Sequence, residues 1–192
     1  DADVLISNWR PGVAEKFGLT AASVRSRWPR LVWVRVSGYG QDGPMADLPS
    51  FDSIVQARVG TSAAMGEQPI LLPFYLADKT AAMFAAQSAL AALVQRGVTG
   101  EGAVVDVAMV DALAYFDVPD RFAAHQRPGE HDARVDRMLG APRPLPTADG
   151  WLVLAPVSGQ QIKRALVAAG LDSAMDELKA QPDAVASSQR FF

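Results

Sequence analysis

The sequence predicts an α/β protein built on a parallel sheet, and three features of the 192-residue chain indicate this class. Short runs rich in β-branched and aromatic residues alternate with helical segments, which is the order of elements in parallel α/β sheets. A glycine-rich loop directly follows one of these runs, in the place where such sheets bind ligands. The segment 76–97, LADKTAAMFAAQSALAALVQRG, is dominated by good helix formers and predicts one long helix.

The first unit is expected to run from a strand through helices to a second strand. Its elements are a strand at 4–7, helices at 13–17 and 21–28, and a strand at 31–36. Pro11 suits the first helical position, because its missing N–H has no partner to lose there. Thr20 is a favoured N-cap for the second helix. The second strand, LVWVRV, is β-branched and aromatic and is expected to be buried.

The loop 37–44, SGYGQDGP, follows the second strand directly. It lacks the Gly-Lys-Ser/Thr ending of a P-loop and the glycine spacing of the dinucleotide-binding fingerprint. On its own it is a weak nucleotide motif, and a simple turn is the alternative. Ser50 is positioned to cap a following helix at 51–58, and the small polar residues 60–68 predict a loop.

The long helix is expected to end at Gly97 and to carry an apolar stripe along one face. The stripe consists of Met83, Ala86, Leu90, Leu93 and Val94. Asp78, near the start of this helix, has two interpretations. Local sequence favours an N-cap, because most Asp residues in this position only cap their helix. The alternative is a carboxylate nucleophile, kept ionised by the helix terminus and enclosed by the apolar run before it.

The rest of the chain predicts a third strand–helix unit, a linker and a second domain. The expected elements are a strand at 103–108, a helix at 110–124, a strand at 151–157, and helices at 160–169 and 174–179. The Pro- and Arg-rich segment 127–146 indicates a linker. We therefore expect part of a large domain over residues 1–124, a linker over 125–147 and the start of a smaller α/β domain over 148–192.

The composition argues against several classes of function. A net charge of -3 and a pI near 5.3 argue against nucleic acid or a membrane surface as partners. The absence of cysteine excludes thiol catalysis, disulfides and cysteine-bound metals. His125 and His131 fall in or beside the predicted linker, so neither a Ser-His-Asp triad nor a histidine metal site is expected. No metal, membrane span or signal peptide is predicted, and we expect a cytoplasmic protein.

Five stretches of the chain match, in order, segments of one known family. They are ADVLISNWRPGVAEKFGL, WPRL, SGYGQDGPMADLPSFDSIVQA, LADKTAAMFAAQSALAAL and TGEGAVVDVAMVDAL. Together they resemble the class III coenzyme A-transferases, which include formyl-CoA transferase, carnitine CoA-transferase and the related α-methylacyl-CoA racemases. The likeness covers residues 2–117 and continues faintly through TADGWLVLAPV. It implies part of a Rossmann-like domain, so we expect the chain to be a fragment of a longer protein.

The resemblance implies an enzyme that transfers coenzyme A between an acyl-CoA and a small carboxylic acid. The family's catalytic aspartate falls on Asp78, which would form an acyl anhydride with the donor and then a thioester with coenzyme A. This reverses the preference for the cap. The interlinked dimers of the family imply a homodimer.

Two further segments are implied to contact coenzyme A: the NxRPG turn with the helix after it, and the glycine-rich loop. Their candidate residues are Asn8, Arg10, Pro11, Lys16, Gly38, Tyr39 and Gly40. The NxRPG turn precedes a predicted helix N-terminus, where phosphates bind well. The structural alternative is a turn proline, a solvated lysine and turn glycines.

Two positions depart from the family pattern. Phe51-Asp52 stands where the racemases carry His-Asp, and the missing acid–base group favours a transferase over a racemase. Ala82 stands where the family usually has Gly, which changes how closely a ligand can approach. Two alternatives stay open. One is an acyl-CoA racemase, and the other is an inactive, truncated relative that acts as a dimerising or CoA-binding module.

Overall fold

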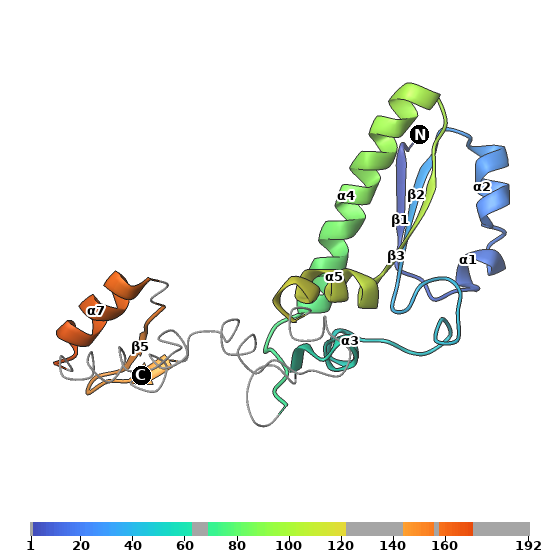
Figure 1. The fold of residues 1–192 in the computed structure, drawn as a ribbon. Helices are drawn as coiled ribbons and strands as arrows, with labels where there is room; N and C mark the ends of the chain where they lie inside the picture. Colours follow the sequence, from blue (N-terminus) through green and yellow to red (C-terminus); the bar gives the residue numbers. More distant parts are fainter. Residues whose placement is uncertain (1, 63–68, 122–143, 156–157, 171–192) are drawn as a thin grey trace, which may run out of the picture. The chain divides into compact units, whose positions relative to one another are not determined.

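The structure, a computed structural model, describes residues 2–62, 69–121, 144–155 and 158–170 (Figure 1). The chain divides into two compact units, Asp1–Pro119 and Asp120–Phe192, and each is described by itself. The first unit contains β1 (Val4–Ser7), α1 (Val13–Lys16), α2 (Ala21–Arg27), β2 (Val32–Ser37), α3 (Asp52–Val59), α4 (Leu76–Thr99), β3 (Val104–Ala108) and most of α5 (Met109–Arg121). The second contains β4 (Pro144–Pro146), β5 (Trp151–Val153) and α7 (Gly159–Ala168).

Three parallel strands form the sheet of the first unit, in the order β1-β2-β3. The register pairs Val4 with Val32, and Trp33 with Val104. Each crossover is helical, with α1 and α2 between β1 and β2, and α3 and α4 between β2 and β3. The predicted α/β class with a parallel sheet is therefore confirmed.

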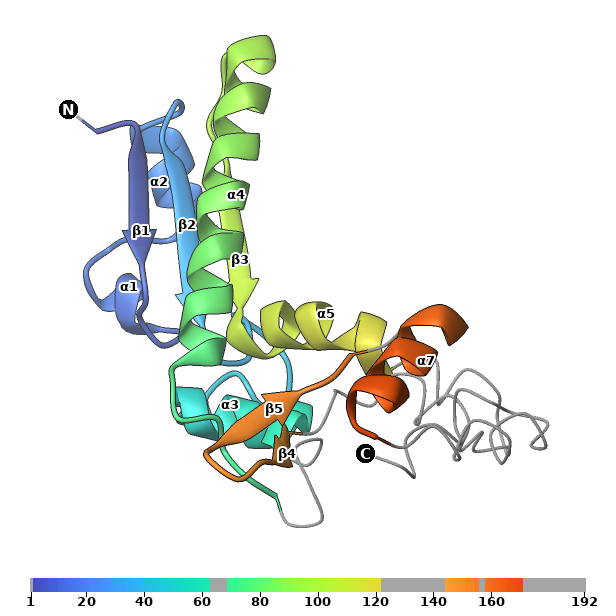
Figure 2. The ribbon, with the colours of Figure 1, turned by 90° about the vertical axis from the view of Figure 1, so that its left-hand side faces the viewer.

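Helices cover both faces of this sheet (Figure 1). Successive side chains of a strand point to opposite faces, so each face carries its own apolar cluster. The cluster against α4 consists of Val32, Val34, Val107, Ala85, Ala89 and Ala92. The cluster on the other face consists of Trp33 with Ala14 and Val24 from α1 and α2. Figure 2 shows α4 lying over β2 and β3, the two strands that it contacts.

The face of α4 that packs on the sheet is lined by alanine. Ala85, Ala89 and Ala92 are buried against Val32, Val34 and Val107 of the strands. The predicted apolar stripe lies mostly elsewhere, since Met83 and Leu90 are each 63% exposed and Val94 is 72% exposed. Small side chains let the helix axis approach the strands closely, and close-packed interiors favour that approach. Size as well as hydrophobicity therefore selects the buried face.

The end of α4 also differs from the prediction. The helix continues through Gly97 to Thr99, so the predicted stop at Gly97 is wrong. Gly100 follows with a φ of 80°, and its N–H donates to the carbonyl oxygen of Arg96. Of the glycines near this end, Gly100 is the one whose left-handed backbone conformation ends the helix.

The short helices of the first crossover are close to those predicted. Thr20 caps α2 as predicted, in a capping box with Ser23. α1 is a single turn that begins at Val13, after Gly12 with a φ of 79°. Pro11 therefore lies before the helix and not at its first position.

The described part of the second unit is a small hairpin and one amphipathic helix. β4 pairs antiparallel with β5, and the turn between them is closed by Thr147 N–H, which donates to the carbonyl oxygen of Gly150. β4 falls at the end of the segment predicted as a linker. Ser158 caps α7, and Ile162 and Leu166 are buried. The predicted helix at 174–179, His125 and His131 lie outside the described residues.

A candidate site at the carboxyl edge of the sheet

The three segments that the sequence singles out meet at one edge of the sheet. The parallel strands β1, β2 and β3 end there, at Ser7, Ser37 and Ala108. The NxRPG turn follows β1 and the glycine-rich loop follows β2. α4 runs antiparallel to the strands, so its first turn, which contains Asp78, begins at this same edge (Figures 1 and 2). The carboxyl edge of such a sheet is the usual place of its ligand site.

A small hydrophobic cluster fixes the start of α4. Ala77, Val55 of α3 and Leu113 of α5 are all fully buried in it. α5 begins directly after β3, so this cluster ties the first turn of α4 to the end of the sheet. Asp78 follows Ala77 in sequence and is exposed in the first unit by itself.

The backbone of Asp78 is held by a carboxylate from another helix. The N–H of Asp78 donates to Asp52 Oδ2 over 2.9 Å, and Asp52 is the first residue of α3. α4 has Tyr75 at its N-cap position and no side-chain cap. The N-cap interpretation of Asp78 is therefore wrong, since Asp52 satisfies one of the free N–H groups at this helix end. The side chain of Asp78 is not used as a cap.

Gln56, one turn further along α3, holds both Asp52 and the chain that leads into α4. Its Nε2 donates to Asp52 Oδ1 and to the carbonyl oxygen of Phe74, and its Oε1 accepts the N–H of Leu72. Sequence reasoning missed the role of this pair. An acid and an amide four residues apart on a helix is a signal that they meet, but nothing local indicates that they contact α4.

The surroundings of Asp78 weaken it as an acid. Although the side chain is exposed, the surrounding protein removes part of the water that would solvate its carboxylate. This desolvation raises the pKa of the Asp78 carboxyl above its ordinary value, and the negative charge of Asp52 raises it further. A carboxylate with a raised pKa is a stronger base and a stronger nucleophile once ionised. Lys79 does not offset this by pairing with Asp78, because its ammonium lies over the ring of Phe74, 5.4 Å from the centroid.

Gly38 connects the glycine-rich loop to the same site through packing. A Cβ on Gly38 would lie 1.9 Å from Ser50 Oγ, so the loop turns back on itself immediately before α3. Ser50 therefore packs on Gly38 and does not cap α3, whose N-cap is Phe51 with no side-chain bond. The carbonyl oxygen of Gly38 accepts the N–H of Val110 at the start of α5. Gly40, with a φ of 91°, makes a turn that favours glycine.

The NxRPG turn is more open. Asn8, Arg10 and Lys16 are exposed, while Pro11 is partly buried. Since α1 has four residues, its terminus supplies only a small helix dipole for a phosphate. Within the described ranges, no hydrogen bond or ion pair joins these residues, or Tyr39, to Asp78. A hydrogen bond thus joins Asp78 to Asp52, and Gly38 packs on Ser50 just before the helix that carries Asp52. Among the described residues, the other candidates lie at the same edge of the sheet but are not hydrogen-bonded to this pair.

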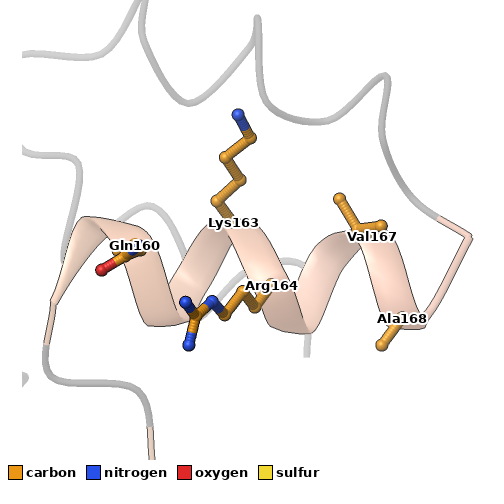
Figure 3. A pocket seen from close by; sticks show the side chains of 5 residues that line it. All are labelled: Gln160, Lys163, Arg164, Val167 and Ala168. Atoms are coloured by element: carbon orange, nitrogen blue, oxygen red, sulfur yellow. The ribbon is translucent and has the colours of Figure 1, made fainter.

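The second unit has a shallow pocket of a different kind. It lies along α7 and is lined by Gln160, Lys163, Arg164, Val167 and Ala168. Figure 3 shows that the two cationic side chains leave the helix in different directions, so they do not converge on one point. This surface does not have the arrangement of an anion site.

The part of the chain that the structure describes shows neither a membrane-spanning helix nor a metal-binding cluster. Among the helices that the structure describes, none has the length and apolar character needed to cross a membrane. Among the same residues, no group of three or more His, Asp or Glu side chains is arranged to hold a metal ion.

Comparisons with known proteins identify relatives of this chain. A probable fatty acyl-CoA transferase of Mycobacterium tuberculosis is 34% identical over 169 residues, which cover 80% of this chain and 43% of the relative. Succinyl-CoA–D-citramalate CoA-transferase of Chloroflexus aurantiacus is 36% identical over 162 residues, covering 79% of this chain and 39% of the relative. The chain thus spans less than half the length of these curated relatives.

Solved structures show the same fold. A crystal structure of the M. tuberculosis protein matches with a TM-score of 0.74 at 30% identity, covering 100% of this chain and 48% of that one. A protein from Brucella suis described as a CAIB/BAIF family member matches in fold, with a TM-score of 0.78 at 23% identity, covering 99% of this chain and 52% of that one. The family model described as CoA-transferase family III matches residues 1–191. Because this match spans nearly the whole sequence, the chain belongs to CoA-transferase family III.

Proposed function

We propose that the protein containing this chain transfers coenzyme A from an acyl-CoA to a carboxylic acid, with Asp78 as the nucleophile. The observation that carries the proposal is the position of Asp78. It lies in the first turn of α4, at the carboxyl edge of the parallel sheet, with its N–H fixed by Asp52 and its side chain free of a capping bond. Relatives named as CoA-transferases of succinyl-CoA and citramalate, or of succinate and glutarate, support the substrate class.

The proposed reaction uses the carboxylate of Asp78 twice. One oxygen attacks the thioester carbonyl carbon of the donor, the C–S bond breaks, and an aspartyl acyl anhydride and a CoA thiolate form. The thiolate attacks the Asp78 carbonyl carbon, releases the donor acid as a carboxylate and leaves an aspartyl-CoA thioester. The acceptor carboxylate attacks this thioester, forming a second anhydride and a thiolate. Attack of the thiolate on the acceptor carbonyl gives the new acyl-CoA and restores Asp78.

The raised pKa of Asp78 suits this chemistry. Desolvation and the negative charge of Asp52 raise the pKa of the Asp78 carboxyl, and a carboxylate of higher pKa is a better nucleophile once it is ionised. The positive end of the helix dipole, in the first turn of α4, is suited to stabilise the oxyanion of the tetrahedral intermediate. The geometry therefore combines a fixed backbone with a reactive carboxylate.

For coenzyme A itself, we propose the loops after β1 and β2 as contacts. Arg10 and Lys16 are exposed cations at this edge, and within the described ranges neither forms an ion pair, so both are free to meet phosphate oxygens. Asn8 and Pro11 shape the first loop. Gly38, Tyr39 and Gly40 form the second loop, whose glycines let the backbone approach a ligand closely.

The proposal also requires a cover for Asp78. An anhydride hydrolyses when water reaches it, yet Asp78 is exposed in the first unit by itself. We propose that the cover comes from the remainder of the protein and from a second copy in a homodimer. The cytoplasmic location stays a prediction.

The test is CoA transfer by the intact protein from an acyl-CoA to an isotopically labelled carboxylic acid. Wild type is expected to form the labelled acyl-CoA, and hydroxylamine added during turnover is expected to modify Asp78. Asp78→Asn is expected to abolish both, while Asp111→Asn, an exposed first-turn acid of α5, retains them. Transfer that survives in Asp78→Asn contradicts the proposal. Exchange of the α-proton in D2O without transfer indicates the racemase alternative, and binding of CoA without either reaction indicates an inactive module.

A further inference from the structure

We propose that Asp52 and Gln56 form a positioning pair for Asp78: they hold the first turn of α4 from the α3 side and so set the rate of the acyl-transfer step without touching the substrate. This inference rests on the proposed function of Asp78. It concerns residues for which neither the family match nor the relatives' names give a role.

The burial of the pair is the first observation. Asp52 is 7% exposed and Gln56 is 1% exposed. A buried carboxylate is unfavourable unless its oxygens are hydrogen-bonded. Here each oxygen has a donor, because Oδ1 accepts from Gln56 Nε2 and Oδ2 accepts from the N–H of Asp78. Both oxygens are engaged and shielded, so Asp52 is not itself placed to attack a substrate.

The second observation is what the pair holds. Gln56 binds the carbonyl oxygen of Phe74 and the N–H of Leu72, each over 3.1 Å. Together the two side chains fix three backbone points on the approach to α4 and in its first turn. A reacting group must be held within a fraction of an ångström of its productive position. The pair fixes the backbone of the nucleophile itself, whereas a general packing contact would fix only the helix.

The third observation is the charge of Asp52. Its negative charge raises the pKa of Asp78, and it also occupies an N–H that would otherwise stabilise ionised Asp78. Among the side chains that the structure describes, the other charged groups on the helices that meet here are Arg58 on α3, Lys79 and Arg96 on α4, and Asp111 and Asp117 on α5. Arg96 lies near the far end of α4 and pairs with Asp3. Arg58 donates to Met45 Sδ, and Asp117 accepts a hydrogen bond from Thr61. The ion pair between Arg35 of β2 and Asp106 of β3 lies on the sheet face away from α4, because side chains alternate between the two faces of a strand. Among these groups, Asp52 is the acid that bonds to Asp78.

The test compares three variants of the intact protein. Asp52→Asn keeps an oxygen that can accept the N–H of Asp78 but removes the charge, and Asp52→Ala removes both. Asp111→Asn is the matched control, because it makes the same substitution at an exposed acid in the first turn of another helix, α5. The readouts are kcat and KM for transfer, the melting temperature, and the titration of the Asp78 carboxyl by carbon NMR with labelled aspartate.

We expect Asp52→Asn to lower kcat at least tenfold with KM within twofold of wild type, and to move the Asp78 titration to lower pH. Asp52→Ala is expected to lower kcat further. Asp111→Asn is expected to change neither kcat nor the titration of Asp78. The inference is overturned if Asp52→Asn keeps the wild-type kcat or titration, or if kcat falls only in proportion to the folded fraction.

Failure of the proposed function gives a different result. If wild type transfers no CoA, or Asp78→Asn transfers it normally, the proposed function fails. The pair is then judged by titration alone: a lower Asp78 midpoint in Asp52→Asn supports its coupling to Asp78, and an unchanged midpoint overturns it.

Discussion

Gly38 and Ser50 lie so close together that a Cβ on Gly38 would fall 1.9 Å from Ser50 Oγ and 2.4 Å from Ser50 Cβ. This contact turns the loop after β2 back on itself just before α3 begins. Asp52, the first residue of α3, then accepts a hydrogen bond from the N–H of Asp78. A glycine that the family resemblance assigns to coenzyme A thus also has a packing role in building the candidate site.

Gly38→Ala is expected to lower the free energy of unfolding by about 1–3 kcal/mol, because the added methyl group overpacks the loop. The double variant Gly38→Ala/Ser50→Gly is expected to recover most of this loss. With the Ser50 side chain removed, the nearest of the atoms found around the Cβ is Ser50 Cα at 3.8 Å. Urea unfolding measures both variants. A Gly38→Ala protein as stable as wild type would contradict the close approach.

Gly97→Ala is expected to stabilise the protein by about 0.5–1 kcal/mol, because Gly97 lies inside α4 and a Cβ there meets no atom within 4 Å. Gly100→Ala is the contrasting variant. Its φ of 80° is left-handed, so alanine is expected to cost about 1 kcal/mol there. Thermal unfolding of both proteins checks the pair, and a loss of stability in Gly97→Ala would place the end of α4 at Gly97 after all.

Ser7→Ala removes the partner of a buried indole. Trp33 is fully buried, and its Nε1–H donates to Ser7 Oγ over 2.9 Å. An unpaired buried donor costs about 1–3 kcal/mol, so this loss of unfolding free energy is expected. Ser26→Ala, at an exposed position of α2, is the control and is expected to stay within about 0.5 kcal/mol of wild type. Equal effects of the two substitutions would contradict the bond.

The same substitution at two neighbouring positions of α4 tests which face packs on the sheet. Ala89 is buried against the strands and Ala86 is exposed. Ala89→Leu is expected to destabilise the protein by about 1–3 kcal/mol, because the added atoms push the helix away from the sheet. Ala86→Leu is expected to change stability by less than about 0.5 kcal/mol. Chemical denaturation distinguishes them, and the reverse order would restore the stripe predicted from sequence.

Much of the first unit follows from local sequence. The β-branched runs at 4–7 and 31–36 indicate strands, and helical crossovers between strands require them to be parallel. The direction of the chain then places Asp78 and both loops at one edge without further information. The cap of α2 is likewise predictable from local sequence, because Thr20 and the residue it caps, Ser23, lie three positions apart.

The rest depends on contacts between distant residues. The bond from Asp78 to Asp52 joins positions 26 residues apart, and no spacing rule predicts it. The buried face of α4 depends on how closely a helix can approach β2 and β3, which hydrophobic periodicity alone does not measure. Gly97 and Gly100 are equally good stop signals in sequence, and the fold selects Gly100 through its left-handed φ.

Asp78→Asn is expected to make the protein more stable at pH 7 and inactive. The pKa of Asp78 in the folded chain lies above its ordinary value, so the folded state binds this proton more tightly than the unfolded state does. The stability from the protonated carboxyl is present at low pH and is lost as pH rises through the unfolded and then the folded pKa. Asparagine does not ionise, so the variant avoids this loss.

The measurement is urea unfolding of wild type, Asp78→Asn and Asp111→Asn over a series of pH values. The stability of Asp78→Asn relative to wild type should be greatest near neutral pH and should disappear at pH values where both proteins are uncharged at this position. Asp111→Asn shows how far the loss of one exposed first-turn acid changes the curve by itself. Parallel curves for wild type and Asp78→Asn would mean that folding leaves the Asp78 carboxyl unperturbed. If Asp78→Asn is more stable than wild type and no longer transfers coenzyme A, Asp78 lowers the stability of the fold while it serves the reaction. Such a trade-off between stability and activity is common at active sites.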